Sequence, residues 1–423
     1  MKKKLALFGG SPVIKRNLTT YNSIGKEEIN SVVKVMKTGI LSKFLATWSK
    51  DFYGGPKVKE FEKKCSKFFK VKHAITVNSW TSGLTVAMGA IGLEPGDEVI
   101  VSPWTMCATA TSIIHWNAIP VFADIEKDTF CLDPNSVEKS ISKYTKAIIA
   151  VDIFGQSSDI NSLSKIAKKY KLKLISDSAQ SPGTFNKRSF TGTISDIGGY
   201  SLNYHKHINT GEGGIIVTNN DYYAERMRLI RNHAEAVVED KGEKNLTNMI
   251  GFNYRMGEIE AAIGIQQLKK LNKLVKNRQF LAQRLTNGIK KLEGINVPKI
   301  RKDCTHAYYI YPLIINYKLI GVSREKIFSA LQKEGVQGLI KGYTNLHLLP
   351  MYQNQIAYGS KGFPWSIANR KINYRKGICP NAEKLNDEIF LGILMCLFNY
   401  SQKDIDLIIK SFKKIWLNLE SLK

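Results

Sequence analysis

The sequence predicts an α/β protein with a mostly parallel sheet covered by helices. Short apolar runs and segments of helical periodicity alternate from residue 73 to residue 170, which is typical of strand–helix–strand units. The pattern changes after Val297-Pro298, where a long aromatic and apolar run begins. At 423 residues the chain has room for two domains. We therefore expect a large domain with an N-terminal segment over residues 1–275, and a smaller C-terminal α+β domain over residues 276–423.

Hydrophobic periodicity and cap residues predict the elements in order. In the first domain, helices are expected over residues 26–37, 57–69, 81–91, 105–116, 134–142 and 160–170, and another begins near 221. Strands are expected over residues 73–77, 98–102, 120–124, 147–151, 173–176, 196–202 and 215–218. A long helix over 256–292 bridges to the second domain, where we expect strands at 306–315 and 336–340 and helices ending at 333, starting at 380 and covering 402–419.

Charge and cysteine usage exclude several classes of protein. The net charge is +26, but the basic residues are spread along the chain without a long basic block, so we expect no nucleic-acid partner. No apolar run reaches the roughly 18 residues of a membrane span, and the apolar part of the basic N-terminus is too short for a signal peptide. Six cysteines without a Cys-x-x-Cys pair fit reduced thiols in the cytoplasm and imply no metal site.

The segment of residues 201–214 surrounds one lysine, Lys206, and reads Ser-Leu-Asn-Tyr-His-Lys-His-Ile-Asn-Thr-Gly-Glu-Gly-Gly. Its three glycines permit tight turns and close backbone approach. A lysine held in such a loop loses water and proton affinity, and its amine becomes a nucleophile toward carbonyls. The segment therefore predicts a Schiff-base lysine, although by itself it is equally compatible with a solvated one.

A second segment, residues 174–183, reads Leu-Ile-Ser-Asp-Ser-Ala-Gln-Ser-Pro-Gly. An apolar strand delivers Asp177 at its carboxyl end, where open α/β sheets bind ligands. An ionised aspartate there can hold the protonated pyridine nitrogen of pyridoxal 5'-phosphate (PLP) and keep the ring electron-poor. A strand that ends in aspartate is common, but its order and spacing before Ser201, Lys206 and a Gly-Glu-Gly-Gly turn are specific.

Together the two segments resemble the DegT/DnrJ/EryC1/StrS family of PLP-dependent sugar aminotransferases. Ser201, Lys206 and residues 211–214 match the family's Ser, Lys and Gly-Asp/Glu-Gly-Gly pattern. Residues 176–180 match its Glu-Asp-x-Ala-Gln pattern, with Ser176 in place of Glu. The resemblance covers nearly the whole chain and implies the PLP-dependent transferase fold type I, bound PLP and a homodimer.

The resemblance also implies the cofactor contacts. Trp80, Thr81 and Ser201 would hold the phosphate at a strand-to-helix turn, although any such turn with Ser and Thr presents similar donors. The family often has a small residue at position 80, so Trp80 either narrows the pocket or packs outward. Met106 stands where the family has an aromatic residue over the ring. Either Met106 covers the ring or Trp104 turns inward, and core packing is the alternative for both.

Two further segments match the family beyond the cofactor ring. Residues 251–255 match a Gly-Tyr-Asn-Tyr-Arg motif, which implies that Asn253 reaches the phosphate of the other subunit's cofactor; its alternative is a turn residue that caps the next helix. Residues 342–352, with Tyr343, His347 and Tyr352, match a loop near the substrate.

These assignments predict an aminotransferase that moves an amino group from an amino acid, expected to be glutamate, to a keto sugar, expected to be nucleotide-linked. Lys206 would bind PLP and move a proton, Asp177 would hold the pyridinium, and Gln180 would lie near the ring's phenolic oxygen. Family members with His in place of the lysine are sugar dehydratases, and His205 and His207 flank Lys206, so a dehydratase is one alternative. A non-catalytic sensor or regulator is the other, and the intact Lys and Asp argue against it.

Overall fold

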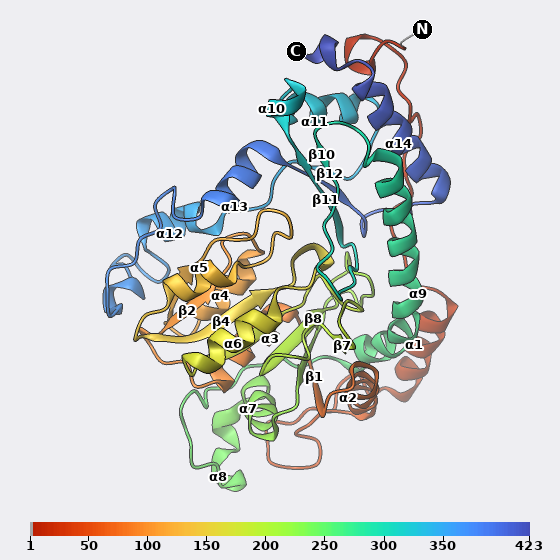
Figure 1. Cartoon of the computed structure of the whole chain (residues 1–423). Coiled ribbons are helices and arrows are strands. Elements are labelled where there is room, and N and C mark those ends of the chain that lie inside the picture. Colours follow the sequence, from red (N-terminus) through yellow and green to blue (C-terminus); the bar gives the residue numbers. More distant parts are fainter. Residues whose placement is uncertain (1–2) are drawn as a thin grey trace.

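A seven-stranded sheet forms the centre of the protein, which we describe from a computed structural model of residues 3–423 (Figure 1). Its strands are β1 (His73–Val77), β2 (Glu98–Val101), β3 (Ile119–Phe122), β4 (Thr145–Val151), β5 (Lys173–Asp177), β8 (Ile197–Ser201) and β9 (Gly214–Thr218). Their spatial order is β1-β9-β8-β5-β4-β2-β3. Neighbours from β8 to β3 pair in parallel, and β9 runs antiparallel to both β1 and β8. The predicted mostly parallel sheet is confirmed.

Helices cover both faces of this sheet, and α1 packs outside them on α9. The helices of this part of the chain are α1 (Lys26–Thr38), α2 (Pro56–Phe69), α3 (Trp80–Ala90), α4 (Cys107–Ile114), α5 (Pro134–Ser140), α6 (Ile160–Lys169), α7 (Asp221–Arg231), α8 (Val238–Lys241) and α9 (Glu258–Ile289). Side chains of β9 alternate between the two layers, because Ile216 packs with α3 whereas Ile215 and Val217 pack with α2 and α9. Burial on both faces requires apolar residues at successive positions, which explains the uninterrupted apolar runs in the sequence.

A second, antiparallel sheet organises the C-terminal part of the chain. Its order is β10-β11-β13-β12, made of β10 (Ile295–Asn296), β11 (Ile310–Ile315), β13 (Phe390–Leu394) and β12 (Leu339–Ile340). It is accompanied by α10 (Tyr317–Ile320), α11 (Arg324–Lys333) and α14 (Gln402–Trp416), and both ends of the chain lie here (Figure 1). Helix α9 runs from the large sheet to this one. The predicted domain boundary at residues 275 and 276 falls inside α9 and stays a prediction.

Residues 341–389 return from the small sheet to the large one. They include α12 (Pro350–Asn354) and α13 (Pro380–Lys384). Tyr352, Trp365 and Tyr374 join the core of the large sheet, and the Tyr374 hydroxyl donates to the Pro120 carbonyl at 2.6 Å. Part of the chain that the sequence assigned to the C-terminal domain therefore stabilises the large one. β6 (Phe185–Asn186) and β7 (Ser189–Phe190) form a separate short hairpin.

The strand predicted over residues 306–315 begins only at Ile310. The amides of Ala307 and Tyr309 instead donate to the carbonyls of Gly155 and Phe154, both at 2.9 Å. These bonds attach residues 307–309 to the large sheet's side of the molecule. The apolar character of the segment was predicted correctly, but its first residues pair with the loop after β4 and not with a strand of the small sheet. Tyr309 is thereby brought to the edge of the large sheet.

Other boundaries also differ from the prediction, and one strand was not predicted. The helix expected over residues 105–116 begins at Cys107, because Met106 has an extended backbone and caps it. The strand expected over 336–340 is reduced to its last two residues, since Gly338 adopts a left-handed backbone with φ +75°. Strand β13 was not predicted, although it is an interior strand of the small sheet. Within residues 3–423, no helix has the length and apolar character needed to cross a bilayer.

Candidate active site

A pocket of about 210 Å³ opens where β4, β5 and β8 end and α3 begins. This is the edge at which open α/β sheets bind ligands. The last residue of each of these strands lines it: Val151, Asp177 and Ser201. Every predicted site residue except Asn253 lies in its wall, namely Trp80, Thr81, Met106, Asp177, Gln180, Ser201 and Lys206.

The loop between β8 and β9 holds Lys206 in this pocket. Leu202 closes the base of the loop, because its amide donates to Gly213 and its carbonyl accepts from Thr210, both at 2.9 Å. Gly214 permits β9 to approach the start of α3: a Cβ at this position would lie only 2.8 Å from the backbone nitrogen of Trp80. The glycine-rich turn therefore holds the lysine loop and the α3 N-terminus together.

The Lys206 amine is removed from water without an ion-pair partner within 4 Å among the described residues. The side chain is 7% exposed, and its Nζ lies 4.3 Å from the centre of the Tyr309 ring. Burial lowers the pKa of Lys206 to about 8, although the negative charge of Asp177 opposes the shift. A lysine with a pKa of about 8 is neutral in roughly one-tenth of the molecules at pH 7, far more than a solvated lysine, and the neutral amine is the nucleophile.

Asp177 is buried and bound only by uncharged donors. Its Oδ1 accepts from the Trp80 indole at 2.7 Å and from the Ala179 amide at 3.2 Å, while its Oδ2 accepts from the Thr109 hydroxyl at 2.7 Å. Thr109 is in turn 3.0 Å from the hydroxyl of Thr105. No Lys, Arg or His of residues 3–423 forms an ion pair with this carboxylate, so it is suited to a cationic ligand group such as a pyridinium.

The start of α3 provides donors for a phosphate. Ser79 caps the helix, and its Oγ accepts from the Ser82 amide at 3.1 Å. The amides of Trp80 and Thr81 come before the first turn is complete and have no partner within the helix. The hydroxyls of Thr81 and Ser201 line the same wall. The pocket therefore offers a partner for each reactive group of PLP: amide and hydroxyl donors for the phosphate, a buried carboxylate for the pyridine nitrogen, and a lysine of lowered pKa for the aldehyde.

Gln180, Met106 and Trp104 are the side chains predicted to lie near the PLP ring. Gln180 lines the pocket; it accepts from the Phe154 amide at 2.7 Å and donates to the Tyr343 hydroxyl at 3.0 Å. Met106 is 54% exposed at the pocket rim, whereas Trp104 is fully buried among Phe130, Phe154 and Phe390. Of the two candidates for covering the ring, Met106 faces the pocket and Trp104 belongs to the core.

The three residues of the predicted substrate loop lie in different surroundings. Tyr343 lines the pocket, but His347 is buried against Glu383, with Nε2 2.9 Å from Oε1. Tyr352 packs into the large core. Only Tyr343 can therefore contact a ligand in this arrangement.

The two histidines beside Lys206 lie in different surroundings. His205 lines the pocket, where burial lowers its pKa to about 4. His207 is fully buried, and its Nε2 lies 2.9 Å from the Ala307 carbonyl oxygen. Across residues 3–423, no three His, Cys, Asp or Glu side chains gather in an arrangement that could hold a metal ion.

Asn253 lies outside the pocket of its own chain. It is exposed, and its carbonyl accepts from the Asn78 side chain at 3.5 Å. The Asn78 amide donates to the Tyr254 carbonyl at 2.9 Å, so the segment lies beside the turn that leads into α3. The single chain therefore leaves Asn253 available to another molecule.

Sequence reasoning missed three contacts of the pocket. Thr109 was predicted to be helical without a role, and its spacing of four from Thr105 was the only available signal. Tyr309 was assigned to a strand. Trp80 was predicted, but for the phosphate and not for its indole bond to Asp177.

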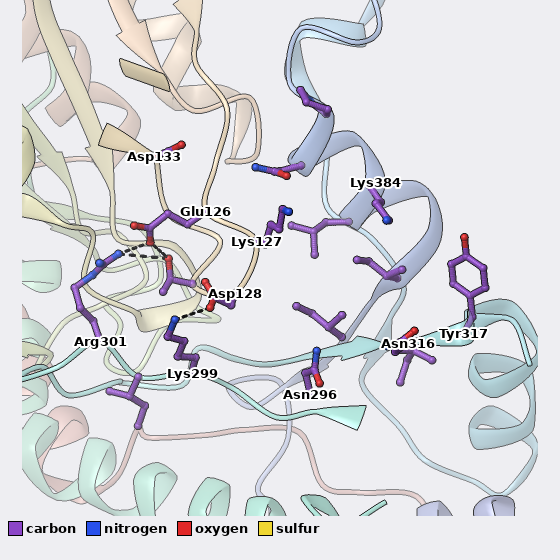
Figure 2. Close-up of a pocket in the computed structure, with 18 of the residues that line it drawn as sticks. Glu126, Lys127, Asp128, Asp133, Asn296, Lys299, Arg301, Asn316, Tyr317 and Lys384 are labelled. Carbon is purple, nitrogen blue, oxygen red and sulfur yellow. Dashed lines mark hydrogen bonds and ion pairs between the residues drawn. The ribbon is translucent and has the colours of Figure 1, made fainter. Parts of the chain in front are cut away.

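A larger cavity lies elsewhere, an open groove of about 1020 Å³ between the two sheets (Figure 2). Two of its acidic residues are already paired, Asp128 with Lys299 at 2.6 Å and Glu126 with Arg301. None of the predicted site residues lines it. Cavity size alone would therefore have selected a groove without the required chemistry.

Comparison with known proteins gives one family. A model of the DegT/DnrJ/EryC1/StrS aminotransferase family matches residues 22–388. The spore coat polysaccharide biosynthesis protein SpsC of Bacillus subtilis (strain 168) is 35% identical over 359 residues, 84% of this chain and 88% of that protein. A GDP-perosamine synthase of Vibrio cholerae is 32% identical over 346 residues, 82% and 91% of the two chains. A 3-oxo-glucose-6-phosphate:glutamate aminotransferase of Bacillus subtilis (strain 168) is 31% identical over 315 residues, 73% and 66%.

Solved structures agree on the fold. An aminotransferase from Psychrobacter cryohalolentis matches with a TM-score of 0.82 at 24% identity, over 96% of this chain and 100% of that one. DesI, solved in the presence of its TDP-sugar product, matches with a TM-score of 0.80 at 23% identity, over 99% and 97%. These likenesses, with the seven-stranded sheet, confirm the predicted PLP-dependent transferase fold type I.

The lowered pKa of Lys206 predicts how the protein would take up PLP. Because only the neutral amine attacks the cofactor's aldehyde, the recombination rate should rise with pH through a midpoint near 8 and then level off. Asp177→Asn removes the charge that raises this pKa, so its midpoint should be lower. Stopped-flow absorbance across a pH series measures both midpoints.

Glu212→Gln is the matched control, because Glu212 lines the same pocket but does not contribute to the shift of Lys206. Its midpoint should equal that of the unmodified protein. A rate that keeps rising to about pH 10, as expected for a solvated lysine, would contradict the assignment.

Proposed function

Because the chain belongs to the DegT/DnrJ/EryC1/StrS aminotransferase family, we propose that it transfers an amino group from glutamate to a keto sugar carried on a nucleotide. The observation that carries the proposal is the position of Lys206 and Asp177 in the wall of one pocket, the amine at lowered pKa and the carboxylate without a cation. A binding protein has no need to bury an unpaired amine. An enzyme that uses the amine as nucleophile and base does.

Each residue of the pocket has a distinct task in the proposed reaction. PLP, when bound, supplies an aldehyde and an electron-poor ring that accepts the electrons released at the reacting carbon. Lys206 would hold PLP through its Nζ and, when freed, would take and return a proton at that atom. Asp177 would accept a hydrogen bond from the ring nitrogen. The α3 N-terminus, Thr81 and Ser201 would bind the phosphate.

The substrate class follows the named activities of the relatives. One relative is named for glutamate as its partner in transamination, and another is named for a GDP-linked amino sugar. SpsC is named for polysaccharide biosynthesis. We propose a nucleotide-linked keto sugar for such a pathway. The six cysteines are all unpaired in residues 3–423, which supports a reducing cytoplasm as the location.

A dehydratase is disfavoured by the pocket geometry. That reaction would need a histidine in the position of the lysine. Here the Lys206 side chain itself lies in the pocket wall, and His207 is turned to the Ala307 carbonyl. His205 is in the wall as well, so a direct test must distinguish the two reactions.

A homodimer completes the proposal. Helix α1 exposes an apolar face in the single chain: Ile29 is 57% exposed, Val33 44% and Met36 54%. Such a face needs cover, and a second copy of the chain related by two-fold symmetry provides it. Asn253, exposed beside the turn into α3, would then reach the phosphate in the partner's pocket.

Borohydride should attach PLP covalently to Lys206. The reagent reduces the carbon–nitrogen double bond between cofactor and lysine, and peptide mass spectrometry identifies the modified residue. Lys414 is the internal control, because it is equally buried but is paired with Glu334 at 2.7 Å and should remain unlabelled. Labelling of Lys414, or of any other lysine in preference to Lys206, would refute the assignment.

The substrate class can be tested by incubating the purified protein with PLP, glutamate and a panel of nucleotide-linked keto sugars. We expect one sugar to gain an amine while an equal amount of 2-oxoglutarate appears, as measured by mass spectrometry. A sugar phosphate with a keto group serves as the comparison substrate. Loss of water from a sugar without consumption of glutamate would favour the dehydratase.

Subunit mixing tests whether the site is shared. Lys206→Ala and Asn253→Asp should each inactivate the homodimer, the second by repelling the phosphate. In a heterodimer, both defects fall in one site and the other site is intact only if Asn253 acts on the partner. Activity should therefore return after subunit exchange, to about one quarter of the unmodified level for random equal mixing. Verified exchange without recovery would place Asn253 outside the shared site.

A further inference from the structure

We propose that Trp80 is a positioning residue that fixes the Asp177 carboxylate in the orientation that meets the cofactor's ring nitrogen. The inference rests on the proposed function, since it concerns how this chain presents Asp177 to PLP. It assigns to the Trp80 indole a task distinct from that of its backbone, which belongs to the phosphate end of the pocket.

The contact is short and shielded from water. The indole nitrogen Nε1 lies 2.7 Å from Oδ1 of Asp177, and the two residues are 4% and 5% exposed. The Ala179 amide donates to the same oxygen at 3.2 Å, and Thr109 donates to Oδ2 at 2.7 Å. Because donors hold both oxygens, the carboxylate cannot rotate without breaking a charge-assisted bond.

Two glycines form a slot for the indole. Gly199 lies beside Asp177 in the pairing of β5 with β8, and a Cβ there would be 2.0 Å from Cζ3 of Trp80. A Cβ at Gly83, one turn along α3, would be 2.7 Å from Cε3. Neither position can carry a side chain while the indole stays in place. Of the two expectations from the sequence, the slot excludes a tryptophan that packs outward, because the indole is held against Asp177 in the wall of the pocket.

The neutral donor also preserves the charge that PLP requires. An arginine or lysine at this position would neutralise Asp177 and compete with the ring nitrogen for it. An indole N–H stabilises the ionised carboxylate and adds no positive charge. Without it the carboxylate is no longer held in line with the ring nitrogen, which then keeps its proton less firmly.

Loss of the ring-nitrogen proton should shift the absorption midpoint of bound PLP in a known direction. When the ring nitrogen loses its proton, the conjugated system loses a positive charge, so the imine nitrogen at the other end of the ring binds its proton more tightly. The visible absorption of bound PLP, which follows that imine proton, should then titrate at higher pH. General loosening of the core would not move this midpoint in a fixed direction.

Trp80→Phe removes the N–H and keeps an aromatic ring. We expect the spectroscopic midpoint of bound PLP to rise by about one pH unit, and PLP to bind roughly tenfold more weakly, the effect of one lost charge-assisted hydrogen bond. Trp116→Phe is the matched control. Trp116 is 7% exposed and its indole also donates at 2.7 Å, but to the Thr85 carbonyl and away from the pocket. Its midpoint and affinity should equal those of the unmodified protein.

A second variant guards against misfolding. Replacing Trp80 with 3-benzothienylalanine exchanges the N–H for sulfur and keeps the shape that the two glycines accept. It should give the same upward shift as Trp80→Phe. An unchanged midpoint in this variant, or an equal shift in Trp116→Phe, would overturn the inference. If the unmodified protein itself forms no visible band with PLP, the proposed function fails instead, so the two failures are distinguishable.

Discussion

The active site depends on the burial of one ammonium group without a direct partner. Lys206 is almost inaccessible to water, and the negative charge of Asp177 is the larger of the effects that oppose the lowering of its pKa. The chain contains a second buried lysine, Lys414, that illustrates the alternative. Its Nζ lies 2.7 Å from Glu334, which also accepts the amides of Ala6 and Val13 and so attaches the N-terminal segment to the small domain. One buried lysine stabilises the fold, and the other is kept reactive.

The hydrogen-bond donors around Asp177 leave its negative charge uncompensated by any ion-paired cation of residues 3–423, which distinguishes the surroundings of Lys206 from those of the ion-paired Lys414. If a cation of the protein bound the carboxylate, neither Lys206 nor a pyridinium would experience its full charge. Trp80 and Thr109 stabilise the carboxylate with neutral hydrogen bonds instead. Both donors come from the starts of helices that follow strands of the large sheet, so the same edge supplies the carboxylate, its donors and the phosphate site. The chemistry is concentrated where the parallel strands end.

The pocket is nevertheless not made by the large sheet alone. Tyr309 reaches it because residues 307 and 309 bond to the loop after β4, and Tyr343 reaches it through Gln180. Residues 341–389 also complete the core of the large sheet. Movement of the C-terminal part would therefore change both the surroundings of the Lys206 amine and the packing behind the sheet. The pocket wall therefore includes Met106, which caps α4 beside the large sheet, and two tyrosines from the C-terminal part, while Trp104 stays in the core.

Local sequence patterns were enough to predict the order of strands and helices around the large sheet, the position of Asp177 at a strand end, and the lysine loop before a glycine turn. These features depend on local pattern, namely hydrophobic periodicity, caps and glycine spacing. Only the tertiary structure decided that residues 306–309 join the large domain, that β13 lies inside the small sheet, and that the Trp80 indole turns to Asp177. Those outcomes depend on contacts between residues far apart in the chain, such as the close approach at Gly199, and no local pattern encodes which distant backbone a side chain will meet.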